Sequence, residues 1–160
     1  MKRLKVIACE VAFRELCYCA SQCRAMIDFT FMTQGLHDKG ATPMKQMLQD
    51  EIDKVDIHKY DAIVLAYGLC SNGVVGLQSK LPMIIPKAHD CITFFLGSKE
   101  RYAEFFDKNR GTYVYTSGWI ERGMNSFHLL IELLQPMIVI LLDSMHSRER
   151  GNFLWLSREI

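Results

Sequence analysis

Three cysteines in this chain lie beside other polar residues, where a thiol can do more than fill space. Cys9 precedes Glu10, Cys70 lies within Tyr-Gly-Leu-Cys-Ser-Asn-Gly, and Cys91 ends the sequence His-Asp-Cys. Thiolates are ligands of zinc and of iron–sulfur clusters, and three of them leave one coordination position open for a substrate. The residue types therefore predict a zinc or iron–sulfur centre held by Cys9, Cys70 and Cys91. The alternative for each cysteine is a small, inert, packed side chain.

Two residues that can transfer protons stand close to these cysteines. Glu10 follows Cys9, and His89 lies two residues before Cys91. Both are therefore candidate catalytic residues. Simpler roles are open for both. Glu10 and Arg14 have the spacing of an ion pair on a helix surface, and His89 could be a structural histidine.

The segment around Cys70 has the composition of a binding loop. It contains Tyr67, Gly68, Asn72 and Gly73, which we predict to contact a cofactor or ligand. The two glycines lack a side chain, so the backbone on either side of Cys70 can come close to a bound molecule.

The other three cysteines are weaker candidates. Cys17, Cys19 and Cys23 match no standard spacing of a zinc or ferredoxin site. Cys17 falls on the apolar face of a predicted helix and is expected to pack in the core. Cys19 and Cys23 are four residues apart and share a helix face, so together they could supply two ligands.

The overall composition excludes several classes of function. The 19 lysines and arginines nearly balance the 18 aspartates and glutamates, so no net field favours nucleic acid or an anionic membrane. No apolar run has the length of a signal-peptide core or a membrane span, and we expect a cytoplasmic protein without structural disulfides. Glycine-rich nucleotide loops, the serine-hydrolase elbow and the His-Glu-x-x-His zinc motif are missing.

The elements that must position these residues alternate along the chain. Buried apolar runs predict strands at 5–8, 27–32, 60–66, 81–86 and 112–115, and less clearly at 136–142. Helical spacing predicts helices at 10–24, from Thr42 to about Val55, at 74–77, after Asp90, after Ser98 and at 127–134. Thr42 is the expected N-cap of the second helix, with Pro43 at its first position.

This order predicts a single α/β domain over residues 1–160, an open, mostly parallel sheet with helices on both faces in a Rossmann-like three-layer sandwich. Ligands of such sheets bind outside the carboxyl ends of the strands. The segments of Cys9, Cys70 and Cys91 follow three different predicted strands, and Thr116 and Trp119 follow a fourth. We therefore expect one site at this edge of the sheet.

Several segments, in order, resemble the domain of unknown function 1638 family of bacteria and archaea. The resemblance rests on Lys-Val-Ile-Ala-Cys-Glu at 5–10, Gln-Gly-Leu-His-Asp at 34–38, the segments at 67–73, 86–91 and 97–101, and Gly-Trp-Ile-Glu-Arg-Gly at 118–123. It covers a core of about residues 4–123. After about Asn125 the chain departs from the family pattern, so the tail at 124–160 is divergent or shortened.

The resemblance implies a setting and a set of residues. Members of this family occur largely in anaerobes, often alongside corrinoid-dependent methyl-transfer proteins, which implies a link to one-carbon metabolism. The residues carried over are Cys9, Cys70 and Cys91, together with Glu10, His37 and His89. Without the family, His37 next to Asp38 is more typical of a loop.

Two further functions are compatible with the same residues. The protein could be a binding or accessory module for a small molecule or a corrinoid methyltransferase partner. It could also be a metal-free thiol enzyme with Cys91 as nucleophile and His89 as base, although residues two apart need not face each other.

Overall fold

The computed structural model describes residues 1–70, 72–109, 114 and 116–122. Within this part of the chain, none of the helices has the length and apolar character needed to cross a membrane. The strand expected at 112–115 falls almost entirely outside the described residues. The helix expected at 127–134 and the strand expected at 136–142 lie wholly outside them.

The described residues contain an all-parallel sheet. Its strands are β1 (Arg3–Cys9), β2 (Met26–Met32), β3 (Ala62–Ala66) and β4 (Met83–Ile84), in the order β2-β1-β3-β4. The prediction of an open α/β sheet is confirmed. β1 lies between β2 and β3. It pairs with β2 over its whole length and with β3 from Leu4 to Ala8.

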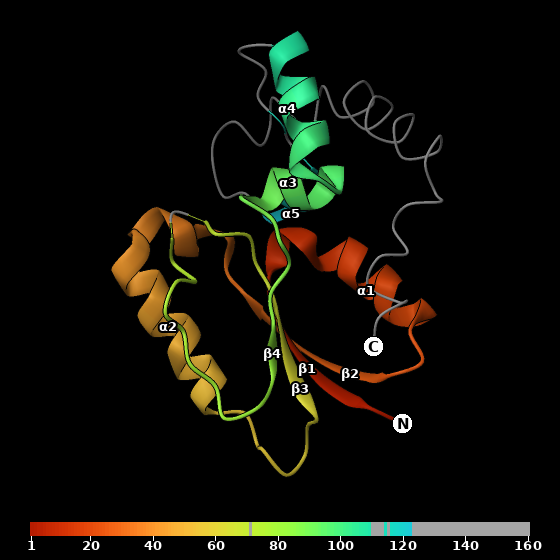
Figure 1. Cartoon of the computed structure of the whole chain (residues 1–160), viewed down its shortest axis with the longest axis vertical. Helices are drawn as coiled ribbons and strands as arrows, with labels where there is room; N and C mark the ends of the chain where they lie inside the picture. Colours follow the sequence, from red (N-terminus) through yellow and green to blue (C-terminus); the bar gives the residue numbers. More distant parts are fainter. Residues whose placement is uncertain (71, 110–113, 115, 123–160) are drawn as a thin grey trace.

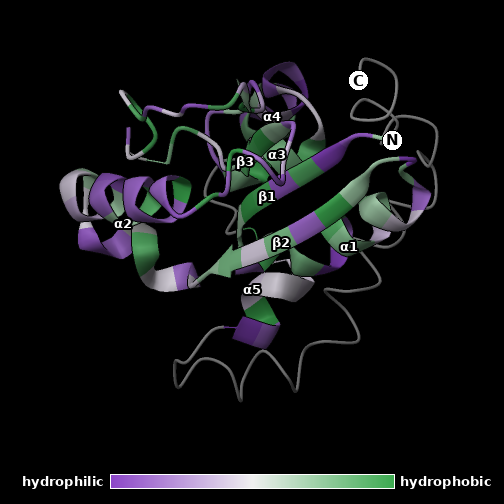
Figure 2. Ribbon diagram, turned by 90° about the horizontal axis from the view of Figure 1, so that it is seen from below, coloured by the Kyte–Doolittle hydropathy of each residue, from purple (hydrophilic) through white to green (hydrophobic). Residues whose placement is uncertain are grey.

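Both faces of the sheet are covered by helices (Figure 1). Successive strand residues point to opposite faces. Val6, Ala8 and Val64 therefore pack on the side of α1 (Phe13–Gln22), while Ile7, Ile63 and Leu65 pack on the side of α2 (Ala41–Asp53). Figure 2 shows the matching pattern, with hydrophilic and hydrophobic bands alternating along α2 and a hydrophobic stretch in β1. A strand buried on both faces explains the continuous apolar runs in the sequence.

Local structure differs from the sequence-based expectation at several places. The 10–24 segment is not one helix, because a 3-10 turn, η1 (Glu10–Ala12), precedes α1. The expected loop at 34–40 forms a second one, η2 (Gln34–Lys39). Residues 74–77 form a turn and coil rather than a helix. The second helix begins at Ala41, so its cap position is Gly40 and not Thr42 as expected. The φ of Gly40 is 87°, a value that only glycine adopts freely.

Three short helices gather beyond the end of the sheet from which α1 starts (Figure 1). They are α3 (Cys91–Leu96), α4 (Lys99–Lys108) and α5 (Ser117–Arg122). The Asp90 carboxylate accepts a hydrogen bond from the Thr93 amide at 2.7 Å, and Ser98 caps α4 in the same way. The helices predicted after Asp90 and after Ser98 are thus confirmed, and these two caps fix where α3 and α4 begin.

Candidate functional site

The strand order creates a crevice between the carboxyl ends of β1 and β3. From β1 the chain crosses to β2 on one side, and β3 and β4 lie on the other. Loops leaving a parallel sheet diverge at such a switch point, which is where ligands of open α/β sheets bind. A cavity of about 340 Å³ lies there, bounded by Cys9, Tyr67 and Cys91. We refer to it as the switch-point cavity.

All three cysteines predicted as ligands line the switch-point cavity. Cys9 is the last residue of β1, Cys70 follows β3, and Cys91 is the first residue of α3. The thiols interact: a charge on Cys91 disfavours ionisation of both Cys9 and Cys70. The structure therefore brings together the three thiols that were expected at one edge of the sheet.

Burial governs the ionisation of these thiols. It raises the pKa of Cys9 and of Cys70 to about 11, with neighbouring thiolates adding to the effect. Burial also raises the pKa of Cys91, although a hydrogen bond from Trp119 acts in the opposite direction. Desolvation thus outweighs the backbone N–H groups at the start of α3, which favour a thiolate at Cys91. All three groups are protonated near neutral pH.

Backbone contacts hold the loop of Cys70 against the start of α3. The Leu69 amide donates to the Ala88 carbonyl at 3.0 Å, and the Cys70 amide donates to the His89 carbonyl at 3.3 Å. Gly68 makes this approach possible, because a Cβ atom there would stand 2.8 Å from the Asp90 Cα. The space beside Gly68 is thus filled by the protein backbone.

Cys70 has an unusual backbone conformation for its residue type. Its φ is 42°, and that of Asn72 is 66°. Residues with side chains adopt this left-handed region at a cost of about 1–3 kcal/mol. Such strain persists only where the surroundings enforce it, and here it is located at a predicted ligand.

Two polar side chains of the switch-point cavity carry buried atoms that make no hydrogen bond with any described residue. They are the hydroxyl of Tyr67 and the amide oxygen of Gln34. Tyr67 is only 4% exposed. Buried polar atoms without partners are rare in native proteins and call for an explanation.

Glu10 has contacts that fix the surrounding segments. Its carboxylate accepts a hydrogen bond from the Gln34 amide at 2.8 Å, and its second oxygen lies 4.0 Å from the Arg122 guanidinium. It therefore links the end of β1 to η2 and to α5. Glu10 does not line the switch-point cavity as the described residues define it.

His89 lies at the mouth of the switch-point cavity. Its side chain is 77% exposed, and its Nδ1 is 3.8 Å from the second carboxylate oxygen of Asp90. An exposed imidazole exchanges protons freely with water. This placement suits a group that carries protons to or from the cavity, and it argues against a buried structural histidine.

α5 closes one side of the cavity and brings Trp119 to it. Gly118 packs directly on the Val11 carbonyl, and an Arg14–Glu121 ion pair ties α5 to α1. The apolar wall of the cavity consists of Val11, Leu36, Ala66, Phe94, Phe95 and Trp119. The sequence reasoning overlooked Gln34, Phe94 and Phe95. Of these three residues, only Gln34 has a signal in the sequence, because it follows the second strand.

The other candidate residues lie elsewhere. Asn72 and Gly73 do not line the switch-point cavity within the described residues, and Gly73 packs on the side chain of Met44. His37 belongs to η2, and its side chain lies outside what the structure describes. The cysteines of the first helix, Cys17 and Cys19, and the following Cys23 do not line the described part of the cavity either.

As placed, no three His, Cys, Asp or Glu side chains among the described residues are grouped closely enough to hold a single metal ion. The three thiols share a cavity and interact electrostatically, but they do not form a closed tetrahedral site of the zinc type.

The family described as protein of unknown function (DUF1638) matches residues 31–145 of the chain. The chain belongs to the DUF1638 family. The match includes Tyr67, Cys70, His89 and Cys91, while Cys9 and Glu10 precede it. No curated protein and no solved structure matches the chain. The site of this DUF1638 protein must therefore be interpreted from its own residues.

Proposed function

We propose that this protein holds a thiolate-ligated metal centre in the switch-point cavity, with Cys9, Cys70 and Cys91 as ligands. The observation that carries the proposal is that these thiols come from three separate segments and line one cavity of about 340 Å³. A charge on Cys91 raises the cost of ionising Cys9 and Cys70, and a charge on Cys9 raises that of Cys70. A bound cation reverses that cost, because it favours thiolates and displaces their protons.

The donor set suits a soft metal, and the spacing favours a cluster over a single ion. Cysteine sulfur selects zinc and iron–sulfur clusters over hard cations. Since no three ligands are grouped for one ion among the described residues, a zinc ion would require at least one of the three cysteine-bearing segments to move. An iron–sulfur cluster is larger and takes ligands that stand further apart. Its fourth coordination position would face the cavity.

The residues around the thiols would prepare the cavity for chemistry. Phe94, Phe95 and Leu36 line the cavity, where they would exclude water and strengthen electrostatic interactions. An iron–sulfur centre with an open position would supply electron transfer or Lewis acidity to a bound substrate. His89 would carry protons at the mouth. Glu10, also predicted as catalytic, would act through its hydrogen bond to Gln34.

The charge of the cavity restricts the substrate. None of the described residues that line it is a lysine or arginine, and Asp90 contributes a carboxylate. An anionic substrate would find no lysine or arginine to pair with among the described lining residues, so we propose a small uncharged molecule. Such a substrate is compatible with the one-carbon and corrinoid methyl-transfer setting that the family resemblance implies, which stays part of the proposal.

The test is metal and acid-labile sulfide analysis, with a visible spectrum, on protein purified without oxygen. We expect iron with sulfide in the wild type, lost in Cys9→Ala, Cys70→Ala and Cys91→Ala. Cys17→Ala, on α1, is the matched control and should keep the metal. If the analysis found zinc without sulfide, the centre would be a single zinc ion and not a cluster. Metal-free wild type with normal circular dichroism would refute the metal centre.

A second function is favoured by the apolar wall formed by Phe94, Phe95 and Trp119. A binding or accessory module would use the same cavity to hold a small apolar molecule without a metal. In that case the cysteine variants would fold and bind normally, and a partner such as a corrinoid methyltransferase would be recovered with the wild type and with each variant.

A further inference from the structure

Gln34 is the only residue with a side-chain amide among the described residues that line the switch-point cavity. Its backbone N–H donates to the Glu10 carboxylate at 2.8 Å, and the other oxygen of Glu10 lies 4.0 Å from the Arg122 guanidinium. These contacts join Gln34, the first residue of η2, to the segment that follows β1 and to α5. The position from which its side chain reaches the cavity is therefore fixed.

The side-chain oxygen of Gln34 is buried and accepts no hydrogen bond from the described residues. A buried acceptor without a donor destabilises a fold, so native proteins rarely keep one without a reason. The terminal torsion of a glutamine side chain is broad, and its amide can turn toward a new donor at little cost. A molecule in the cavity that carries an N–H group would supply this donor.

The other polar groups of the cavity favour an uncharged molecule. The Asp90 carboxylate already accepts two hydrogen bonds from Thr93, from its amide at 2.7 Å and from its hydroxyl at 2.9 Å. None of the described lining residues is a lysine or an arginine. Burial raises the pKa of the three cysteine thiols, so they carry no charge near neutral pH. A neutral N–H donor can therefore pair with the Gln34 oxygen without bringing an uncompensated charge into the cavity.

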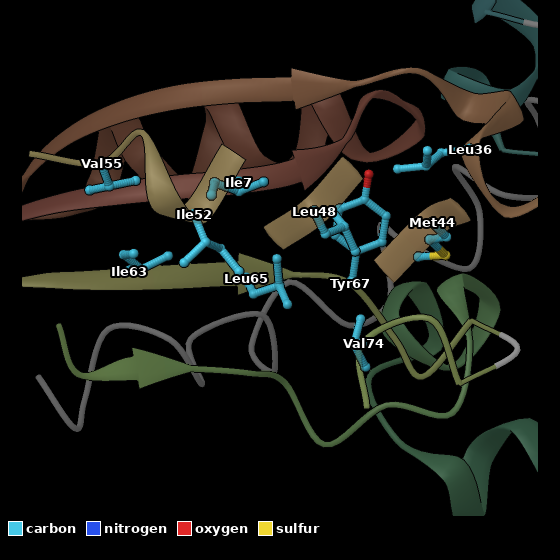
Figure 3. Close-up of a cluster of buried hydrophobic side chains, with 10 residues drawn as sticks. All are labelled: Ile7, Leu36, Met44, Leu48, Ile52, Val55, Ile63, Leu65, Tyr67 and Val74. Atoms are coloured by element: carbon cyan, nitrogen blue, oxygen red, sulfur yellow. The ribbon is translucent and has the colours of Figure 1, made fainter. Parts of the chain in front are cut away.

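Aromatic side chains give the cavity flat surfaces. The rings of Phe94 and Phe95 lie 6.3 Å apart and nearly perpendicular, at 88°, and Trp119 is a third aromatic residue of the lining. Flat aromatic molecules stack on such rings or meet their edges. Leu36 and Tyr67, only 1% and 4% exposed, belong both to the lining and to the packed core under α2 (Figure 3). A wall anchored in the core is a preformed surface, as in most small-molecule sites.

We propose that the switch-point cavity binds a flat, uncharged aromatic molecule with an N–H group, and that Gln34 selects this molecule by accepting a hydrogen bond from the N–H. The inference rests on the proposed function only in taking this cavity as the binding site, and it requires no metal. The cavity of about 340 Å³ is at the lower end of the range for ligand pockets, which suits a small ring system.

Indole and benzofuran are probes that isolate the contribution of the N–H group. The two molecules have nearly the same flat shape, but benzofuran has an oxygen in place of the N–H and is the less polar. An apolar cavity without a dedicated acceptor would therefore bind benzofuran at least as tightly as indole. We expect the wild type to prefer indole by about 3–10-fold, the contribution of one hydrogen bond.

Gln34→Met removes the acceptor and keeps a side chain of similar length. In this variant we expect the preference for indole to be lost, while benzofuran binds as in the wild type or more tightly. The melting temperature should stay equal or rise, because a buried polar atom without a partner is removed. Gln22→Met, at the exposed end of α1, is the matched control and should keep the preference.

The experiment titrates both probes into protein purified without oxygen, by isothermal titration calorimetry, and measures iron, zinc and sulfide in the same samples. Equal binding of the two probes, a preference for benzofuran, or no binding of either by the wild type would overturn the inference, whatever the metal content. A preference for indole that survives in Gln34→Met would overturn it as well. A Gln34-dependent preference in metal-free wild type would support the inference and refute the metal centre, whereas the same preference in metal-loaded protein would support both.

Discussion

Two tyrosines at opposite ends of the sheet show how differently its two edges are built. Tyr60 precedes β3, and its hydroxyl donates to the Asp28 carboxylate at 2.8 Å. The same carboxylate accepts from Arg3 at 2.9 Å and lies 3.4 Å from Lys59. Tyr67 follows β3, and its buried hydroxyl makes no hydrogen bond with a described residue.

The contrast extends to the charges around the two residues. At the end where the strands begin, the hydrogen bond from Tyr60, together with the cations of Arg3 and Lys59, lowers the pKa of Asp28 to about 2. At the end where the strands finish, buried thiols oppose one another's ionisation. Among the described residues, the polar groups named at the first edge are paired, whereas the second edge has buried polar atoms without a hydrogen bond. An edge with polar groups in reserve is typical of a binding site.

The largest expected effect concerns the reactivity of the thiols in the metal-free protein. The pKa of Cys9 and of Cys70 is raised from 9.0 to about 11. A pKa that is about two units higher lowers the thiolate fraction about 100-fold near neutral pH. We expect iodoacetamide to alkylate both at least that much more slowly than a model thiol, with rates rising up to about pH 11. Mass spectrometry of the labelled peptides measures this, and fast labelling at pH 7 would contradict the burial argument.

A second prediction tests the backbone contact that joins Cys70 to α3. In Gly68→Ala the new Cβ would lie 2.8 Å from the Asp90 backbone, which cannot be relieved by a side-chain rotation. We expect a loss of about 1–3 kcal/mol in unfolding free energy and weaker metal binding. Gly35→Ala is the control, because its Cβ would be 3.9 Å from the nearest atom of the described residues, an oxygen of the flexible Asp38 carboxylate. Equal urea midpoints for the two variants would show that the contact is not needed.

The sequence predicted the elements better than their arrangement. Buried parallel strands show as continuous apolar runs, and helix starts are local signals. The predicted strands that lie within the described residues and the helices after Asp90 and Ser98 are therefore confirmed. Residues 74–77 were assigned to a helix on short apolar spacing alone, which cannot distinguish a helix from a turn. β4 is only two residues long, since Pro82 and Pro86 on either side cannot donate to a ladder.

The sequence predicted only part of the candidate site, because it shows which residues follow a strand but not how the strands are ordered. The rule that ligands bind beyond strand ends placed the cysteines at one edge, and Cys9, Cys70 and Cys91 do line one cavity. The strand order is a property of long-range packing, so the sequence could not place the crevice between β1 and β3. For the same reason it could not show that Glu10 pairs with Gln34 and Arg122.

The smallest expected effect tests the completed edge. The lowered pKa of Asp28 means that its charged form stabilises the fold fully above the unfolded value of about 3.9, and that this contribution is lost as the pH falls through about 2. The hydrogen bond from Tyr60 is the main cause of the shift. Tyr60→Phe should therefore raise the pKa of Asp28 and flatten the dependence of stability on pH below 4. Asp28 is partly exposed, so the change is small.

Urea midpoints at pH 7, 4, 3 and 2, with an NMR titration of the Asp28 carboxyl, measure this effect. The matched variant is Tyr67→Phe, which should leave the acid dependence as it is in the wild type, because its hydroxyl makes no hydrogen bond to a carboxylate of the described residues. If both tyrosine variants changed the acid dependence equally, the two edges would not differ in the way that their polar contacts indicate. A selective effect of Tyr60→Phe would show that only the edge where the strands begin is electrostatically complete without a ligand.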